Sequence, residues 1–257
     1  MPSWDSQQYL KFAKERTQPS LDLASRISHL NPRTVLDLGC GPGNSTAVLE
    51  RTFPDAHILG VDSSPAMIAS ARAAHPALEF DVFDATSSFD ALPGPFDLVF
   101  SNACIQWVPD NESVIRRMMG ALAHGGTLAV QVPINANATP HLCIRRVVES
   151  ERWRAHFPHP RIFYTLEPDT YFDVLARLTD EFTLWKTTYV HRMASVDTII
   201  EWYRGTGLRP YLDRLADDEI PAFEADVRDE MARHFFPREN GEIAMEFPRL
   251  FFTATRP

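Results

Sequence analysis

VLDLGCGPG, residues 35–43, decides the fold that this sequence predicts. It joins a short apolar run to three glycines that are each separated by one residue. The apolar run is typical of a buried strand, and the glycines indicate a backbone that passes close to another group. A tight turn into a helix with no ligand would also use glycines, so the neighbouring residues must decide between the two.

The chain around this stretch alternates between expected strands and expected helices. Apolar runs that predict strands lie at 34–39, 56–62, 77–84, 96–102 and 125–133. The helices expected with them lie at 5–30, with a break or turn at Pro19, and at 44–53 (capped by Asn44 or Ser45), 64–74 and 111–123. This alternation predicts an α/β fold with a doubly wound, mostly parallel, Rossmann-like sheet covered on both faces.

After Pro133 the spacing of the elements changes. Helices are expected at 140–153, 168–179, 195–204 and 217–235, and the last two of seven strands at 182–193 and 242–256. Pro248 lies inside the final strand, which predicts an edge position or a bulge. We expect one domain over 1–257, with a ligand-binding core at 30–135 and a helical lid at 195–240, before the last strand.

Polar residues end the first strands of the predicted sheet. Asp62, Asp84 and Asn102 follow the second, third and fourth apolar runs. Because the carboxyl ends of parallel strands meet at one edge, we expect these side chains to lie close together. Asp62 also suits a helix cap, but an acid roughly 20 residues after a glycine turn is where α/β folds bind ribose hydroxyl groups.

Two common nucleotide motifs do not match the glycines. A phosphate-binding loop would need a lysine after Gly43, and none follows. The dinucleotide fingerprint needs its third glycine one residue later, and Pro42 removes a backbone N–H that a pyrophosphate would use. These differences disfavour an NAD-dependent oxidoreductase.

Taken together, these residues resemble the class I S-adenosylmethionine-dependent methyltransferases, whose first motif is an acid followed by Gly-x-Gly-x-Gly. The resemblance implies S-adenosyl-L-methionine as cofactor, with Asp37 at its methionine end, Asp62 on its ribose and Asp84 at its adenine. The cofactor-binding residues that it implies are Asp37, Gly39, Gly41, Gly43, Asn44, Asp62, Ser63, Met67, Asp84, Ala85, Asn102 and Gln106.

A narrower resemblance covers nearly the whole chain. The stretches NACIQWVPD (102–110), TGLRPYL (206–212) and FPRLFF (247–252) together resemble the trans-aconitate methyltransferase family, whereas 134–170 departs from it. The resemblance implies a methyl ester formed on a carboxylate of trans-aconitate or a similar small polycarboxylic acid. Such a carboxylate is ionised at neutral pH, so we expect positioning rather than a catalytic base. Gln106 and Trp107 would lie near the methyl group, although Trp107 equally suits the core.

An arginine would hold the remaining carboxylates, because its planar fork binds a carboxylate through two hydrogen bonds. Arg209 is the first choice, since it follows a glycine turn and precedes Pro210, which predicts a loop at the hinge of the lid. His191 is expected to be structural. The candidate substrate-binding residues are Tyr9, Arg16, Trp107, Tyr189, Trp202, Arg209 and Arg249.

Composition narrows the class of protein. The 257 residues carry a net charge of −9, which disfavours binding to nucleic acid or to an anionic membrane. The three cysteines show no metal-ligand spacing, so we expect no metal and a reduced, cytoplasmic protein. The polar N-terminus does not resemble a signal peptide, and no stretch is apolar enough to span a membrane. A small polycarboxylate is the expected partner, with no obligate protein partner.

Two other functions stay open at this point. A carboxyl methyltransferase acting on a malonyl group held by a carrier protein resembles this chain through the Gln-Trp pair. It would need a docking surface for an acidic carrier, whereas this chain is itself acidic. A non-catalytic S-adenosylmethionine-binding module is disfavoured because the first motif and the acid after the second strand are both intact.

Overall fold

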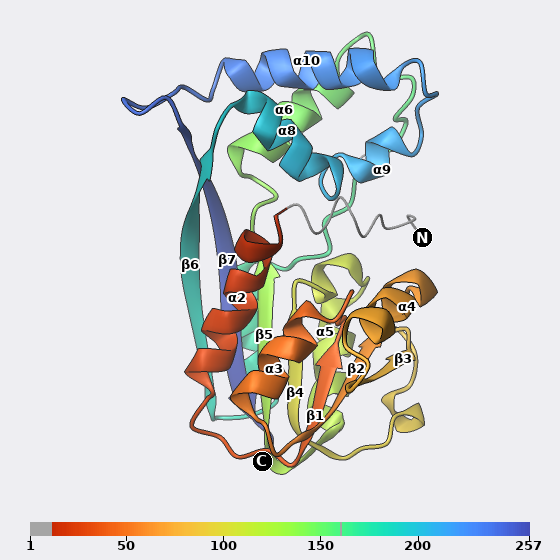
Figure 1. Cartoon of the computed structure of the whole chain (residues 1–257), viewed down its shortest axis with the longest axis vertical. Coiled ribbons are helices and arrows are strands. Elements are labelled where there is room, and N and C mark those ends of the chain that lie inside the picture. Colours follow the sequence, from red (N-terminus) through yellow and green to blue (C-terminus); the bar gives the residue numbers. More distant parts are fainter. Residues whose placement is uncertain (1–11, 160) are drawn as a thin grey trace. The chain divides into compact units, whose positions relative to one another are not determined.

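The computed structural model describes residues 12–159 and 161–257, and within them the chain divides into two compact units (Figure 1). The described part of the first, here called the sheet unit, comprises 13–134, 164–187 and 249–257. The described part of the second, the helical unit, comprises 12, 135–159, 161–163 and 188–248. The predicted cofactor-binding core falls in the sheet unit, whereas the predicted lid at 195–240 falls in the helical unit. Closure of that lid stays a prediction.

Seven strands form one sheet in the order β3-β2-β1-β4-β5-β7-β6. Strands β1 to β5 pair in parallel, and β7 runs antiparallel to β5. The predicted doubly wound, mostly parallel sheet is therefore confirmed. The strands are β1 Thr34–Leu38, β2 His57–Asp62, β3 Glu79–Val82, β4 Phe96–Asn102, β5 Leu122–Pro133, β6 Phe182–Met193 and β7 Ile243–Thr255.

Helices cover both faces of this sheet. The apolar sides of α5 and α7 pack onto strand residues such as Leu36 and Val99 in one buried cluster. On the other face, α2 and α3 lie in front of the strands in Figure 1. The helical elements of the sheet unit are α2 Ala13–Arg26, α3 Asn44–Thr52, α4 Pro65–Ala74, η1 Phe89–Ala91, η2 Ile105–Trp107, α5 Asn111–Gly120 and α7 Pro168–Ala176.

The helical unit has a core of its own, rich in aromatic residues. Phe223 lies at its centre, with ring centroids 5.1 Å from Trp153 and 5.5 Å from Phe157. An ion pair between Arg204 and Glu224 joins α8 to α10 at the surface. The helices of this unit are α6 Thr139–Val148, α8 Val196–Arg204, α9 Arg209–Leu212 and α10 Ile220–Ala232.

Several local predictions were wrong. Gly43, in a left-handed conformation, precedes α3 as its cap, because the Ser45 hydroxyl group bonds to a strand carboxylate instead. Pro19 lies buried inside α2 rather than breaking the chain there. The edge position considered for Pro248 is wrong, because β7 lies between β5 and β6, and its pairing with β5 begins only at Arg249. The alternative, a bulge at Pro248, stays a prediction.

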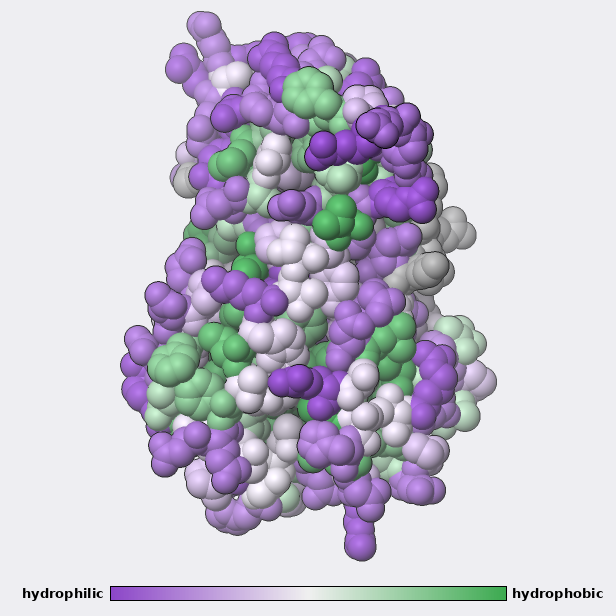
Figure 2. Space-filling view, turned by 90° about the vertical axis from the view of Figure 1, so that its left-hand side faces the viewer, coloured by the Kyte–Doolittle hydropathy of each residue, from purple (hydrophilic) through white to green (hydrophobic). Residues whose placement is uncertain are grey.

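Figure 2 shows hydrophobic side chains in separate groups among hydrophilic ones on the face that it presents. None of the helices in the described ranges has the length and apolar character that a bilayer crossing needs.

Candidate functional site

The loop after β1 carries the three glycines, and all three adopt a positive φ. A Cβ atom on Gly39 would lie 2.2 Å from the Sγ atom of Cys104, so this position must lack a side chain. A Cβ atom on Gly41 would meet no described atom within 4 Å. Gly39 is therefore required by internal packing, whereas the backbone at Gly41 borders open space that a ligand can enter.

Asp37 is a fully buried carboxylate on β1. Its Oδ2 atom accepts hydrogen bonds of 2.7 Å from the hydroxyl groups of Ser45 and Thr46. Its Oδ1 atom has no hydrogen-bond partner among the described residues. Burial raises the pKa of Asp37 to about 6, against the lowering effect of the two hydroxyl donors. One buried carboxylate oxygen is thus available to a donor on a ligand.

Asp62 ends β2 and holds the glycine loop. Its Oδ2 atom accepts a hydrogen bond from the Gly41 N–H, and its Oδ1 atom accepts one from the Ser64 N–H. The cap of α4 is Ser64, which accepts a bond from the Met67 N–H. Asp62 is therefore not the helix cap, and its carboxylate faces the loop.

The end of β4 supplies two further acceptors. Ala103 has a positive φ of 54°, which a residue with a side chain rarely adopts and which is common next to functional sites. Gln106 holds this turn by donating from Nε2 to the Ala103 carbonyl group over 2.7 Å. The side-chain oxygens of Asn102 and Gln106 are buried, and neither has a partner in the part of the chain that the structure describes.

The other predicted cofactor residues lie in the same unit. The Phe83 N–H donates to the Asp62 carbonyl group, which brings the segment after β3 beside the end of β2. Asp84 itself accepts two bonds from Thr86. Met67 and Ala85 are buried, and Asn44, Ser63 and Trp107 are half-buried, so Trp107 is not a fully enclosed core residue.

A row of polar side chains continues across the sheet. Gln131 on β5 is the register partner of Asn102 on β4, and its Oε1 atom accepts a 3.1 Å bond from the Nη1 atom of Arg249 on β7. Both Gln131 and Arg249 are buried. The Nε2 atom of Gln131 lacks a partner within the described ranges. Gln131 is not among the residues predicted from the sequence, although it carries the same signal as Asp62, a lone polar residue near the end of an apolar strand.

The remaining substrate candidates are divided between the two units. Tyr9 lies outside the described residues. In the sheet unit, Arg16 is buried on α2. In the helical unit, the ring of His191 stacks on Tyr189 and lies 4.7 Å from that of Trp202. Arg209 lies on α9 rather than in a loop, where its Nε atom pairs with Asp213 at 2.8 Å.

These features fit a cofactor that carries amino and hydroxyl groups. The carboxyl edge of the sheet unit presents acceptors from Asp37, Asp62, Asn102 and Gln106, two of them on carboxylates. It also leaves open space at Gly41. Hydrogen-bond donors on a ligand would satisfy buried acceptors that otherwise cost free energy.

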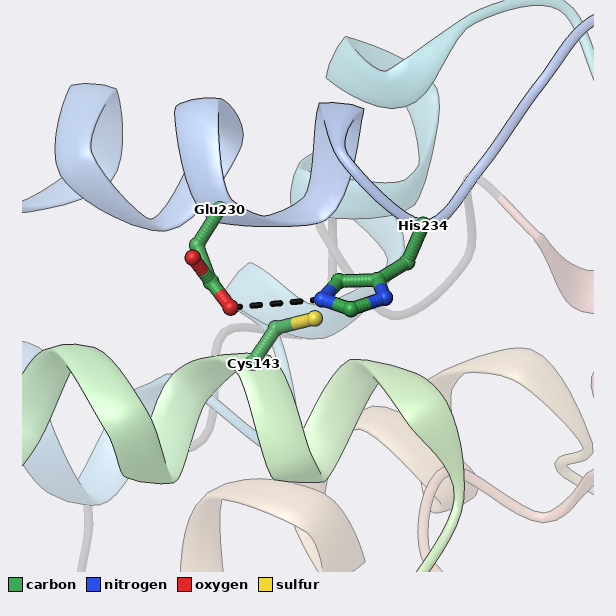
Figure 3. Close-up of side chains that lie close together, drawn as sticks. All are labelled: Cys143, Glu230 and His234. Atoms are coloured by element: carbon green, nitrogen blue, oxygen red, sulfur yellow. Dashed lines mark hydrogen bonds and ion pairs between the residues drawn. The ribbon is translucent and has the colours of Figure 1, made fainter.

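A second cluster of polar side chains, in the helical unit, has a different explanation. Cys143, Glu230 and His234 converge from α6 and the end of α10, with ligand-type atoms within 4.8 Å of one another (Figure 3). The Nη1 atom of Arg146 lies 2.9 Å from Glu230 and 2.7 Å from His234, so a guanidinium already neutralises the carboxylate. Burial also raises the pKa of Cys143 to about 11, which keeps the thiol protonated. The cluster does not by itself indicate a metal ion.

Known proteins are similar to this chain in sequence and in fold. A family model described as a methyltransferase domain matches residues 35–126. The YcgJ protein from Bacillus subtilis has a TM-score of 0.59 at 15% identity, over 93% of this chain and 98% of that one. Phosphoethanolamine N-methyltransferase 2 of Haemonchus contortus, solved with S-adenosyl-L-methionine, has a TM-score of 0.55 at 17% identity, over 93% of this chain and 53% of that one. At these identities the likeness concerns the fold alone.

Sequence relatives are much closer. A trans-aconitate 2-methyltransferase of Azoarcus sp. strain BH72 is 43% identical over the full length of both chains. One of Methylobacterium radiotolerans is 41% identical, over 100% of this chain and 99% of the relative. The chain therefore belongs to the trans-aconitate 2-methyltransferase family.

Proposed function

We propose that this protein transfers the methyl group of S-adenosylmethionine to a carboxylate of trans-aconitate, forming a methyl ester. Membership of the family supports the acceptor. The structural observation that carries the proposal is the buried Arg249, whose guanidinium donates to Gln131 beside Asn102. A buried cation at this edge, next to a set of unsatisfied acceptors, suits a site that takes a donor-rich cofactor and an anionic acceptor.

The chain's residues would hold the cofactor through its polar groups. When bound, S-adenosylmethionine supplies an electrophilic methyl group on a sulfonium. The free Oδ1 atom of Asp37 would accept from the amino group of the methionine part, and Asp62 from the ribose hydroxyl groups. Asp84 would accept from the adenine amino group. Gly39, Gly43, Asn44, Ser63, Met67 and Ala85 complete the cofactor contacts that we propose.

The acceptor needs orientation and not proton removal. A carboxylic acid with a pKa near 4 is already a carboxylate at neutral pH, so no side chain has to act as a base. Arg249 would bind one carboxylate through its fork, and the Nε2 atom of Gln131 offers one more donor. These contacts would align the attacking oxygen to within about 3–3.5 Å of the methyl carbon.

A dry site favours this reaction because charge is lost as carboxylate and sulfonium react. Gln131 and Arg249 are buried, and Asn102 and Gln106 present buried amide oxygens, so little water reaches these groups. Tyr9, Arg16, Trp107, Tyr189, Trp202 and Arg209 remain proposed substrate contacts, because their chemistry suits a small polycarboxylate.

The test is methyl transfer to a panel of acids, read by mass spectrometry. The panel holds trans-aconitate, cis-aconitate, itaconate, isopropylmalate, citrate and a malonyl-carrier protein. We expect a monomethyl product from trans-aconitate, with one S-adenosylhomocysteine formed per ester. If S-adenosylhomocysteine binds but only the malonyl carrier is methylated, the acceptor is wrong. If it binds and no acid is methylated, the chain is a binding module.

A further inference from the structure

A cavity of about 520 Å³ lies within the helical unit. Two elements supply most of its polar lining, α6 and the segment that follows it. Its wall also includes a residue of α9. The residues that define its character are His141, Arg145, Arg154, Phe157, Arg161 and Tyr211.

The cavity concentrates positive charge in an acidic protein. Three arginines line it, Arg145, Arg154 and Arg161, against one carboxylate, that of Glu149. The chain as a whole has a net charge of −9. A concave surface with an excess of guanidinium groups attracts anions, and arginine forks match the geometry of carboxylates.

Arg161 is held in place before any ligand binds. Its Nη1 atom donates to the Gly207 carbonyl group over 2.8 Å, and its guanidinium lies 4.5 Å from the centre of the Phe163 ring. A Cβ atom on Gly207 would lie 2.3 Å from the ring of Tyr203 and 3.0 Å from that of His141. Only glycine therefore lets this loop approach closely enough to fix Arg161.

Aromatic rings form another part of the wall. His141 is buried, and its ring contacts those of Phe163 and Tyr203 edge to face at 5.1 Å. Burial lowers the pKa of His141 to about 3, and the charges of Arg161 and Arg145 lower it further, so the ring is neutral at pH 7. Flat apolar faces beside arginine forks suit a planar anion with several carboxylates.

We propose that this cavity is a binding site for a small planar polycarboxylate, with Arg161 and Arg145 as its principal ligands. The choice of a polycarboxylate rests on the proposed function, because the acceptor is such an acid. Two sources share this chemistry. The anion is either the acid that becomes methylated or a second polycarboxylate that regulates the enzyme.

The test is the affinity of the full-length protein for defined acids, measured by calorimetry. The probes are trans-aconitate, its saturated analogue propane-1,2,3-tricarboxylate, and acetate. Arg161→Met keeps the apolar stem and removes the fork, and Arg161→Lys keeps the charge alone. Arg145→Met provides a second variant if Arg161→Met does not fold. Arg228→Met, on an exposed part of α10, is the matched control.

We expect the native protein to bind trans-aconitate more tightly than the saturated acid and to bind acetate very weakly. Both methionine variants should lose about tenfold or more in affinity for trans-aconitate, and Arg161→Lys should lose less. The control should bind as the native protein does. Absence of binding to the native protein, or equal binding in both methionine variants and the control, would overturn the proposal.

The same variants separate the two sources of the anion. If the anion is the methyl acceptor, the KM for trans-aconitate rises in step with the loss of binding. If it is a regulator, binding falls and that KM does not change. Arginine-dependent binding without methylation of any acid would refute the proposed function and leave this site standing. Methylation of an acid, together with binding that does not depend on the arginines, would support the proposed function and refute this site.

Discussion

The carboxylate of Asp62, at the end of β2, holds the glycine loop after β1 through a 3.1 Å hydrogen bond from the Gly41 N–H. The Ser64 N–H donates to the other carboxylate oxygen over 2.9 Å. A carboxylate has about four acceptor positions, so about two remain for the hydroxyl groups of a ribose. We therefore expect Asp62 both to shape the loop and to bind the cofactor.

Asp62→Ala should weaken the binding of S-adenosylhomocysteine about tenfold or more. Each hydrogen bond to a charged group contributes about 1.5–3 kcal/mol, and the loop also loses its anchor. Titration calorimetry measures the affinity directly. Asp55→Ala, in the exposed turn before β2, is the control and should bind as the native protein does. Equal affinities in the two variants would contradict a role for Asp62.

Two glycines of the loop should respond differently to alanine. Gly39→Ala places a Cβ atom 2.2 Å from Cys104, so the free energy of unfolding should fall by about 2–4 kcal/mol. Gly41→Ala meets no described atom and should cost only about 1 kcal/mol for its positive φ. Its Cβ atom should nevertheless weaken cofactor binding, because it enters the open space. Urea unfolding and calorimetry measure the two quantities, and equal losses of stability would contradict this division.

Asp37 should make stability depend on pH. Its pKa is raised by burial from 3.8 to about 6, so the folded protein holds the proton at pH values where the unfolded chain has lost it. The stability linked to this proton is fully present below about pH 4 and declines as the pH rises through 6, by about 3 kcal/mol. The Asp37→Asn variant should lack this decline. Unfolding free energies of both proteins between pH 4 and 7.5 provide the comparison, and parallel curves would exclude a raised pKa.

Arg249→Lys should raise the KM for trans-aconitate about tenfold and leave the affinity for S-adenosylhomocysteine unchanged. Lysine keeps the charge but loses the two-pronged contact with a carboxylate. Arg209→Ala, measured in parallel, should also raise this KM if Arg209 contacts the substrate. Arg51→Lys on the exposed side of α3 is the control. A KM unchanged in Arg249→Lys would remove Arg249 from the acceptor site.

The sequence predicted those parts of the fold that depend on local pattern. Buried parallel strands appear as continuous apolar runs, so β1, β2, β4 and β5 were located to within a few residues. The acids at their ends followed from the same rule, because the carboxyl ends of parallel strands share an edge. Family resemblance then supplied the chemistry that local pattern lacks.

Contacts between distant residues could not be predicted in this way. Nothing in the sequence indicates that Cys104 packs against Gly39, 65 positions earlier, or that Gln131 bonds to Arg249, 118 positions later. The sequence also does not indicate a role for Arg161, which becomes visible only through its hydrogen bond to the carbonyl group of Gly207. Within the TGLRP stretch, Gly207 is therefore as notable as Arg209.

The central claim is that the methyl group ends on a carboxylate oxygen. The most direct test uses S-adenosylmethionine with an isotopically labelled methyl group and trans-aconitate, followed by mild alkaline hydrolysis of the product. We predict that all transferred label is released as methanol, because an ester is cleaved by base. Label that stays on the acid after hydrolysis, or no transfer to the acid at all, would contradict the proposed carboxyl methylation.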